Sequence, residues 1–514
     1  MIPFNSCHIA ELIFTPSFHS WSSGKSDMKR AVNMLASMPR INVELVNRLL
    51  LMMIALGSVA WMVHMADYWQ RSLQMVGLFA VIAGGVSVAS VCVYLALRGR
   101  VATIKHLVRE LFLLVLVLLL VEAWVINEAP ATWTDNVVAG RYLERQQTAR
   151  KLGVRFDPRT VSEVVADLRE QGIDALPGVS RSWPGMPQVR KRLPEGFYPL
   201  SHASNAQIVE CNEDGQYLVY GTDEFGFNNP SGLVASGQID VAIVGESHVL
   251  GHCVAPGESF VDVVRGVFPR TANFALAYTL SLSQLGSVRE YVEPLKPPLV
   301  LWVVNPGLAV TSGDEGSDPV LRRYLDPAFS QNLLYRQAEV DAAVRTLSLG
   351  IQATSDHELR QELQRAESQR FSRLYALGQV RARLDMTRRW QRPPPGPDTA
   401  LFEQSLRLAN ATVDSWGGRL VVAVMPSYAE TMGERKESMR HHLVMDIVNR
   451  LGIEAIDGAA LFLAQVDGPS LFAMNKANHP NAAGHALLGR YIVEELRRKK
   501  LDLPSIAIAI QEPS

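Results

Sequence analysis

The sequence predicts an α/β fold, in which a parallel sheet lies between two layers of helices, preceded by an all-α transmembrane region. Two observations predict it. In the C-terminal part, short and nearly continuous apolar runs alternate with helical segments, which is typical of parallel strands covered on both faces. Before residue 130, three apolar segments each approach the ~20 residues that a helix needs to cross a bilayer.

The three apolar segments predict membrane helices over 49–66, 75–97 and 107–126. Basic residues gather before the first segment and between the second and the third, so the positive-inside rule places both stretches in the cytoplasm. The sequence therefore predicts a multi-pass protein of the inner membrane with an extracytoplasmic, periplasmic C-terminal domain. The alternative is two spans and a buried helix, which would leave that domain in the cytoplasm.

The net charge of the 514 residues is −1, which gives no electrostatic reason to expect a nucleic-acid partner. The four cysteines, Cys7, Cys92, Cys211 and Cys253, match no zinc or CxxC spacing, so the sequence predicts no structural metal. No cofactor is expected. Cys211 and Cys253 could form a disulfide in an oxidising compartment, but the sequence does not show their separation in space.

The predicted organisation has five parts. They are a cytoplasmic tail (1–45), the transmembrane region (46–128), a connector (129–214), the α/β domain (215–500) and a C-terminal tail (501–514). In the connector, the stretch 157–172 predicts a helix, because Thr160 and Glu163 have the spacing of a capping box. In the α/β domain, a charged helical insertion over about 330–412 interrupts the strands.

The apolar runs of the α/β domain predict its strands, at 240–245, 272–276, 299–304, 420–425 and 453–457. The first run ends in Gly-Glu-Ser, which puts Ser247 at the carboxyl end of a strand, where open α/β sheets bind ligands. A helix is expected to begin within 257–267, and backbone N–H groups between a strand and a helix can stabilise an oxyanion. A serine nucleophile needs a base. His479, just before a helix expected from about Ala482, is the candidate.

These segments resemble blocks of the SGNH/GDSL hydrolases. "VGESHVLGHCVAPGESFVDVV" (244–264) is similar to the block of the nucleophilic serine, and "HPNAAGHALLGRYI" (479–492) to the block of the catalytic histidine. "TDEFGFNNP" (222–230) resembles a segment of exported members that act in polysaccharide modification. The resemblance covers about residues 215–497 and implies a flavodoxin-like, three-layer α/β/α domain.

The resemblance also implies roles for single residues. Ser247 would be the nucleophile and His479 the base, while Asn305, in "VVNPG" (303–307), would donate to the oxyanion together with the backbone N–H of Ser247. The family takes a further donor from a glycine N–H, and here that place falls around Tyr278. Further candidates for contacts in the cleft or with the substrate are Glu246, His248, His252 and Asn475.

This sequence departs from the family pattern at the residue that should orient the histidine. The family has an aspartate two or three residues before it, and here Ala477 and Lys476 stand at those positions. A Ser–His dyad or a carboxylate from elsewhere in the fold are the alternatives. In addition, Glu246 stands where the family has the aspartate of Gly-Asp-Ser.

The resemblance implies a membrane-anchored, extracytoplasmic serine esterase that removes acyl groups, above all acetyl, from a carbohydrate or an exported polysaccharide. An O-acetyltransferase with the same Ser–His site, and a non-catalytic glycan-binding or assembly protein, are the alternatives. The partners expected on this reading are the acylated carbohydrate, the lipid bilayer, and a membrane protein of polysaccharide export or acyl transfer.

Overall fold

The computed structural model describes residues 134–499, except 135, 179–186, 311–312, 376–398, 434, 466 and 477–478, together with five isolated residues between 115 and 123. The chain divides into two compact units, Met1–Leu118 and Leu119–Ser514. The second unit contains all the elements discussed below.

The prediction of a multi-pass membrane protein with a periplasmic domain is contradicted. In the described part of the chain, no helix is both long enough and apolar enough to cross a bilayer. The 39-residue helix α13 (Gln337–Tyr375) has the length, but its sequence is rich in charged residues. Of the three predicted spans, 49–66 and 75–97 lie outside the described residues, as does most of 107–126.

A parallel five-stranded sheet of order β5-β4-β6-β7-β8 forms the core and confirms the predicted α/β class. Its strands are β4 (Val241–Val244), β5 (Thr271–Asn273), β6 (Leu299–Val304), β7 (Arg419–Val424) and β8 (Glu454–Asp457). Every residue of β4 and β6 is buried, as expected for central strands with helices on both faces.

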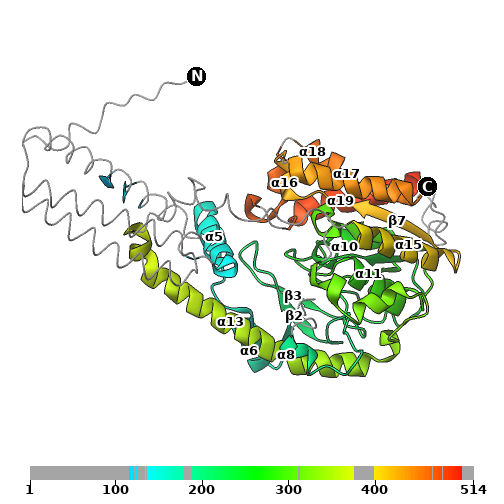
Figure 1. Cartoon of the computed structure of the whole chain (residues 1–514), viewed down its shortest axis with the longest axis horizontal. Coiled ribbons are helices and arrows are strands. Elements are labelled where there is room, and N and C mark those ends of the chain that lie inside the picture. The colour runs from blue at the N-terminus through cyan, green and yellow to red at the C-terminus, as the bar shows by residue number, and fades with distance from the viewer. Residues whose placement is uncertain are drawn as a thin grey trace, which may run out of the picture. The chain divides into compact units, whose positions relative to one another are not determined.

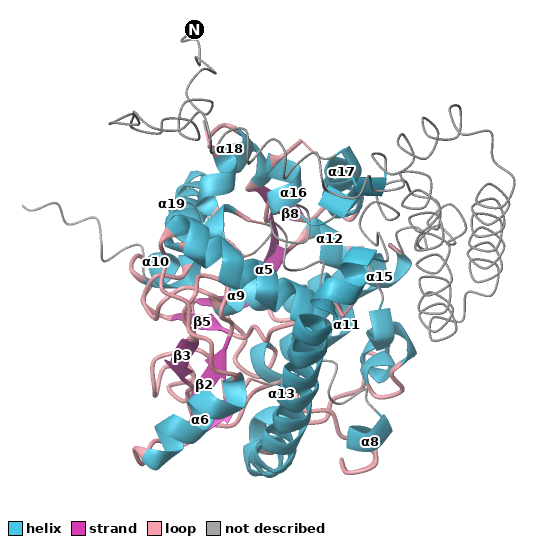
Figure 2. Ribbon diagram, turned by 90° about the vertical axis from the view of Figure 1, so that its left-hand side faces the viewer, coloured by secondary structure: helices cyan, strands magenta, loops and turns pink. Residues whose placement is uncertain are grey.

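Helices cover both faces of this sheet (Figures 1 and 2). The main ones are α10 (Phe260–Arg265), α11 (Ser281–Ser287), α15 (Ala400–Asp414), α17 (Arg435–Arg450) and α19 (Ala482–Arg498). The chain moves in one direction from β4 to β5 and in the other from β5 through β6 and β7 to β8. Right-handed crossovers therefore put α10 on one face and α11, α15 and α17 on the other. In agreement, α10 packs against α19, and α11 against α15.

Short helices connect these elements. They are α8 (Pro187–Arg190), α9 (Ser247–Leu250), α12 (Pro306–Ala309), α16 (Tyr428–Thr431) and α18 (Ala459–Leu463), with the π-helix η2 (Val288–Val292) and the 3₁₀ helices η3 (Gly313–Ser317), η4 (Leu321–Leu325), η5 (Leu333–Tyr335), η7 (Gly468–Leu471) and η8 (Ala473–Asn475).

A small second sheet lies in the segment before residue 222. It consists of β1 (Ala175–Pro177), β2 (Gln207–Glu210) and β3 (Leu218–Gly221), with β1 parallel and β3 antiparallel to β2. Two helices precede it, α5 (Val137–Leu152) and α6 (Val161–Glu170). The helix α6 begins at the expected capping box, in which Thr160 and Glu163 each bond the other's backbone N–H. The segment expected as a connector thus contributes both helices and strands.

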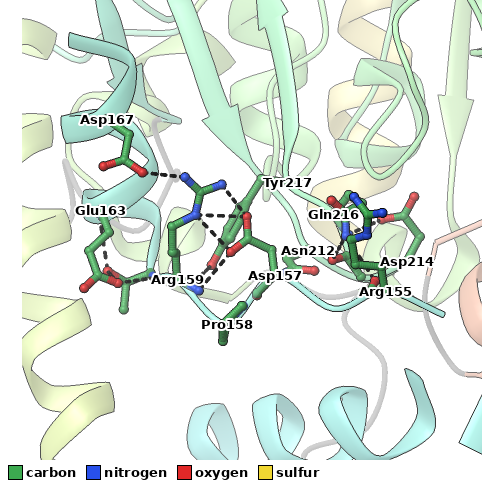
Figure 3. Close-up of polar contacts among 12 residues, drawn as sticks. Arg155, Asp157, Pro158, Arg159, Glu163, Asp167, Asn212, Asp214, Gln216 and Tyr217 are labelled. Carbon is green, nitrogen blue, oxygen red and sulfur yellow. Dashed lines mark hydrogen bonds and ion pairs between the residues drawn. The ribbon is translucent and has the colours of Figure 1, made fainter. Parts of the chain in front are cut away.

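The turn between β2 and β3 is fastened to the link between α5 and α6 (Figure 3). The side-chain amide of Asn212 donates to the carbonyl oxygen of Asp157 over 2.8 Å, and the N–H of Asp157 donates to the carbonyl of Gly215, also over 2.8 Å. Gly215 has φ +99°, and a Cβ there would lie 2.3 Å from the carbonyl oxygen of Arg155. A glycine is therefore required for this close approach.

Candidate active site

Ser247 lies two residues beyond the end of β4, which Gly245 and Glu246 separate from it, and is the first residue of the single-turn helix α9. The N–H of a first helical residue has no acceptor within its own helix, so it can point at a ligand. The preceding Gly245 lets the chain turn here, since a Cβ would lie 2.3 Å from a methyl of Val249 and 2.7 Å from the carbonyl oxygen of Val303. The helix expected within 257–267 begins as α10 at Phe260, and α9 is an additional turn before it.

His479 lies just before α19, as expected, and its imidazole reaches the serine. The distance from His479 Nε2 to Ser247 Oγ is 2.7 Å. Asn481 fixes the loop of the histidine, because its side chain accepts from the N–H of Gly484 and donates to the carbonyl of Ser470. The structure therefore brings together the two residues that the sequence placed 232 positions apart.

Glu213 supplies the carboxylate that orients this histidine. Its Oε2 lies 2.8 Å from His479 Nδ1 and accepts the backbone N–H of His479 over the same distance. With a proton on Nδ1 donated to Glu213, Nε2 carries a lone pair and can accept the hydroxyl proton of Ser247. Of the two alternatives left by the sequence, the geometry matches a carboxylate from elsewhere in the fold.

Arg145 of α5 holds the other oxygen of this carboxylate. The distance from its Nη2 to Glu213 Oε1 is 2.6 Å. Burial alone would raise the pKa of Glu213, but the imidazole of His479 and the charge of Arg145 lower that pKa well below its ordinary value. Burial also tends to lower the pKa of His479, and here the carboxylate of Glu213 outweighs it and raises the pKa.

A disulfide joins the segment of the carboxylate to the segment of the nucleophile. Cys211, two residues before Glu213, is bonded to Cys253, six residues after Ser247, with their Cα atoms 5.5 Å apart. The Sγ of Cys253 lies 3.8 Å from His479 Nδ1. Sequence reasoning missed Glu213, because it lies in a turn outside the main sheet. A predicted disulfide between Cys211 and Cys253 is the one sequence signal that would have placed this turn beside the serine.

Glu246, the residue before the serine, is buried and is the N-cap of α9. Its Oε2 accepts the hydroxyl of Ser247 over 2.5 Å and the N–H of His248 over 3.2 Å, and its Oε1 lies 2.5 Å from His248 Nδ1. Burial would raise the pKa of Glu246, but the imidazole of His248 and the bond from Ser247 lower it to about 2. The Ser247 hydroxyl thus has two acceptors within reach, His479 and Glu246.

A cavity of about 510 Å³ opens onto the serine. The residues lining it include five predicted site residues, Ser247, His248, Tyr278, Asn305 and His479. The Oδ1 of Asn305 accepts the N–H of Gly307 over 2.9 Å and so caps α12, which leaves its Nδ2 as the donor toward the cavity.

Tyr278 has φ +61°, a backbone conformation that favours glycine. This is the place at which the resembling family has its glycine. The tyrosine adopts the left-handed backbone of a glycine there, and the residue is 56% exposed.

Besides the buried Glu246, two further candidates, His252 and Asn475, do not line the cavity. His252 is buried behind His479, with their ring centroids 4.8 Å apart, and burial lowers its pKa to about 3. Its Nε2 lies 3.7 Å from an oxygen of the buried Glu210. Asn475 contributes its backbone carbonyl, which accepts the hydroxyl of Tyr428 over 3.1 Å, while its neighbours Met474 and Lys476 line the cavity.

Three groups of described residues have donor atoms close enough to hold a metal ion. Two of them include a cysteine of the disulfide, whose sulfur is not a thiolate ligand. The third consists of Glu246, His248 and His479, and an ion there would compete with the Ser247–His479 hydrogen bond. The donor set thus overlaps the residues of the serine site.

No family model and no curated protein matches the sequence. The similar solved structures include a lipolytic protein of the G-D-S-L family from Desulfitobacterium hafniense DCB-2, at 12% identity and a TM-score of 0.29, covering 50% of this chain and 99% of that one. Another is a two-domain esterase active on acetylated mannans, co-crystallised with mannopentaose, at 11% identity and a TM-score of 0.26. That match covers 52% of each chain, so this chain spans about half of the esterase. At such scores neither similarity bears on the chemistry of this chain.

Proposed function

We propose that this chain is a serine esterase of the SGNH/GDSL type that removes acyl groups, above all acetyl, from a carbohydrate through an acyl-serine intermediate. The observation that carries the proposal is the unbroken hydrogen-bonded line from Ser247 through His479 to Glu213, at 2.7 and 2.8 Å, beside an open cavity. A nucleophile, a base and a carboxylate that orients the base are the parts that acyl transfer requires.

In the first half of the reaction, Nε2 of His479 takes the proton of the Ser247 hydroxyl while Oγ attacks the carbonyl carbon of the ester. The negative charge that develops on the carbonyl oxygen is stabilised by the backbone N–H of Ser247 and by Nδ2 of Asn305. His479 then gives its proton to the leaving alcohol oxygen, and the acyl group stays on Oγ. Glu213 stabilises the imidazolium throughout this half.

In the second half, water replaces the alcohol. His479 takes a proton from the water as its oxygen attacks the acyl carbon, and returns it to Ser247 Oγ when the carboxylic acid leaves. Each proton taken is given back, so the enzyme is regenerated without any other reactant.

The lining of the cavity supports a carbohydrate as the acylated alcohol. The aromatic side chains of Tyr278 and Tyr428 line the cavity, among polar side chains. Such rings can pack against the apolar faces of a sugar, while polar groups bond its hydroxyls. The resemblance of "TDEFGFNNP" to a segment of polysaccharide-modifying proteins agrees with this choice.

The test is serine-dependent hydrolysis by the full chain. Wild type is compared with Ser247→Ala on 4-nitrophenyl acetate and on acetylated glucose, with the exposed Ser236→Ala as the matched control. We expect Ser247→Ala to lower kcat by about 10⁴-fold or more, as for loss of a nucleophile elsewhere, and mass spectrometry to find an acetyl group on the peptide of Ser247. Equal turnover by wild type and Ser247→Ala would rule the esterase out. Turnover only with a sugar acceptor present would instead identify an acyltransferase.

A further inference from the structure

The helix α5 forms one wall of the cavity, although it ends at Leu152 and the sheet that carries the serine begins only at Val241. Four of its residues line the cavity, Arg141, Glu144, Arg145 and Thr148. Their spacing of three, four and seven places them on one face of the helix. The wall is thus built from the polar stripe of a helix and carries several charges.

Most of these charges have a partner within the protein. Arg145 is paired with Glu213 over 2.6 Å, and Lys476, which also lines the cavity, lies 3.7 Å from Glu144. Arg141 is the remaining arginine or lysine among the described lining residues. Its side chain is exposed to the cavity, and no described carboxylate lies within ion-pair distance of it. The wall therefore has one positive charge in excess.

We infer that the substrate of this site carries a negative charge on its alcohol part, and that Arg141 binds this anionic group while Ser247 attacks the ester. The inference rests on the proposed esterase function and specifies its substrate class. A guanidinium binds a carboxylate or a phosphate through two parallel hydrogen bonds, which gives orientation as well as attraction. A positive charge in the lining of a cavity also raises the local concentration of anionic ligands.

Binding to an inactive chain tests this inference separately from catalysis. Calorimetry on full-length Ser247→Ala compares three ligands, acetylated glucose, acetylated glucuronate and acetylated glucose 6-phosphate. We expect the two anionic ligands to bind about tenfold or more tightly than acetylated glucose, in line with a charge-assisted pair. Tighter binding of the glucuronate identifies a carboxylate as the natural group, and tighter binding of the phosphate ester identifies a phosphate.

Adding Arg141→Gln should abolish this preference, while Arg141→Lys should retain part of it. The matched control is Arg150→Gln, on the same helix, exposed and outside the cavity lining, which should keep the preference. A second measurement needs no variant at position 141. Raising the salt concentration should weaken binding of the anionic ligands more than that of acetylated glucose.

Equal binding of the three ligands, or a preference that survives Arg141→Gln, would overturn the inference. Neither result would affect the esterase proposal, which depends on hydrolysis by the wild type. Conversely, a wild type without hydrolytic activity that still prefers anionic ligands through Arg141 would retain the binding site and refute the esterase.

Discussion

Glu213 Oε2 lies 2.8 Å from Nδ1 of His479, although 266 positions separate the two residues along the chain. The carboxylate comes from the turn between β2 and β3, and the histidine from the loop before α19. The carboxylate beside the histidine therefore comes from a turn outside the main sheet, and three sets of interactions hold that turn in place. They are the ion pair with Arg145, the disulfide of Cys211 and the bonds from the α5–α6 link.

Glu213→Gln should lower kcat by about 10³- to 10⁴-fold, because the imidazole loses the carboxylate that sets its tautomer and stabilises its charged form. The matched control is Glu367→Gln, an exposed carboxylate on α13, which should have wild-type activity. Steady-state hydrolysis of 4-nitrophenyl acetate measures both. Wild-type activity in Glu213→Gln would mean that the proposed esterase works as a Ser–His dyad.

The pH dependence should also change in Glu213→Gln. His479 acts as a base only when neutral, and Glu213 raises its pKa above the ordinary 6.5. The kcat/KM of the wild type should therefore rise with pH through this raised pKa. Without the carboxylate the pKa of His479 falls, so the acid limb of the profile should move to lower pH while the rate decreases. An acid limb at the same pH in Glu213→Gln and in the wild type would show that a group other than His479 controls the pH dependence of kcat/KM.

Arg145→Gln should shift the same limb in the opposite direction. The charge of Arg145 lowers the pKa of His479, so its removal raises this pKa and moves the acid limb to higher pH. The kcat at high pH should fall less than in Glu213→Gln, since the carboxylate itself remains. A pH profile of kcat/KM measures the shift, with Arg150→Gln as the control on the same helix. A shift to lower pH would contradict the role given to Arg145.

Removing the disulfide should affect both stability and rate. The bond closes a loop of 42 residues, for which the chain-entropy relation gives about 4 kcal/mol as its contribution to the free energy of unfolding. In Cys211→Ser with Cys253→Ser, the thermal midpoint should fall, and the rate should fall because the turn of Glu213 loses its tether. Thermal unfolding and kcat measure the two effects, with Cys7→Ser as the control.

A double-mutant cycle separates a positioning role of the disulfide from a merely stabilising one. If the disulfide acts through Glu213, removing it should lower the rate of the wild type by a much larger factor than it lowers the rate of the Glu213→Gln variant. Equal losses in both backgrounds would assign the disulfide to stability alone.

Asn305→Asp should lower kcat by at least about 10²-fold, because one oxyanion donor is lost and a carboxylate charge is placed beside the developing oxyanion. This variant keeps the oxygen that accepts the N–H of Gly307, so the cap of α12 is preserved and a folding defect is not expected. Circular dichroism and steady-state kinetics check the two statements. Wild-type kcat in a folded Asn305→Asp would assign the oxyanion to backbone donors.

The sequence by itself determined the parallel strands and pointed to two residues of the candidate site. Continuous apolar runs are a local property, and strands such as β6, buried along its whole length, therefore lie where the runs predicted them. Ser247 and His479 follow local patterns too, a strand end and a helix start. The predicted multi-pass membrane localisation was contradicted, because no helix in the described part of the chain is both long enough and apolar enough to cross a bilayer.

Only the tertiary structure decided which carboxylate orients His479 and which helix closes the cavity. Glu213 and Arg145 stand in no motif, and a carboxylate or a guanidinium at a surface turn or helix is ordinary in any sequence. They become parts of one site because the fold brings α5 and the β2–β3 turn against the loop of His479, where a 2.6 Å ion pair and a disulfide hold them. Side-chain hydrogen bonding depends on distances of a few ångströms, and these are set by packing rather than by spacing along the chain.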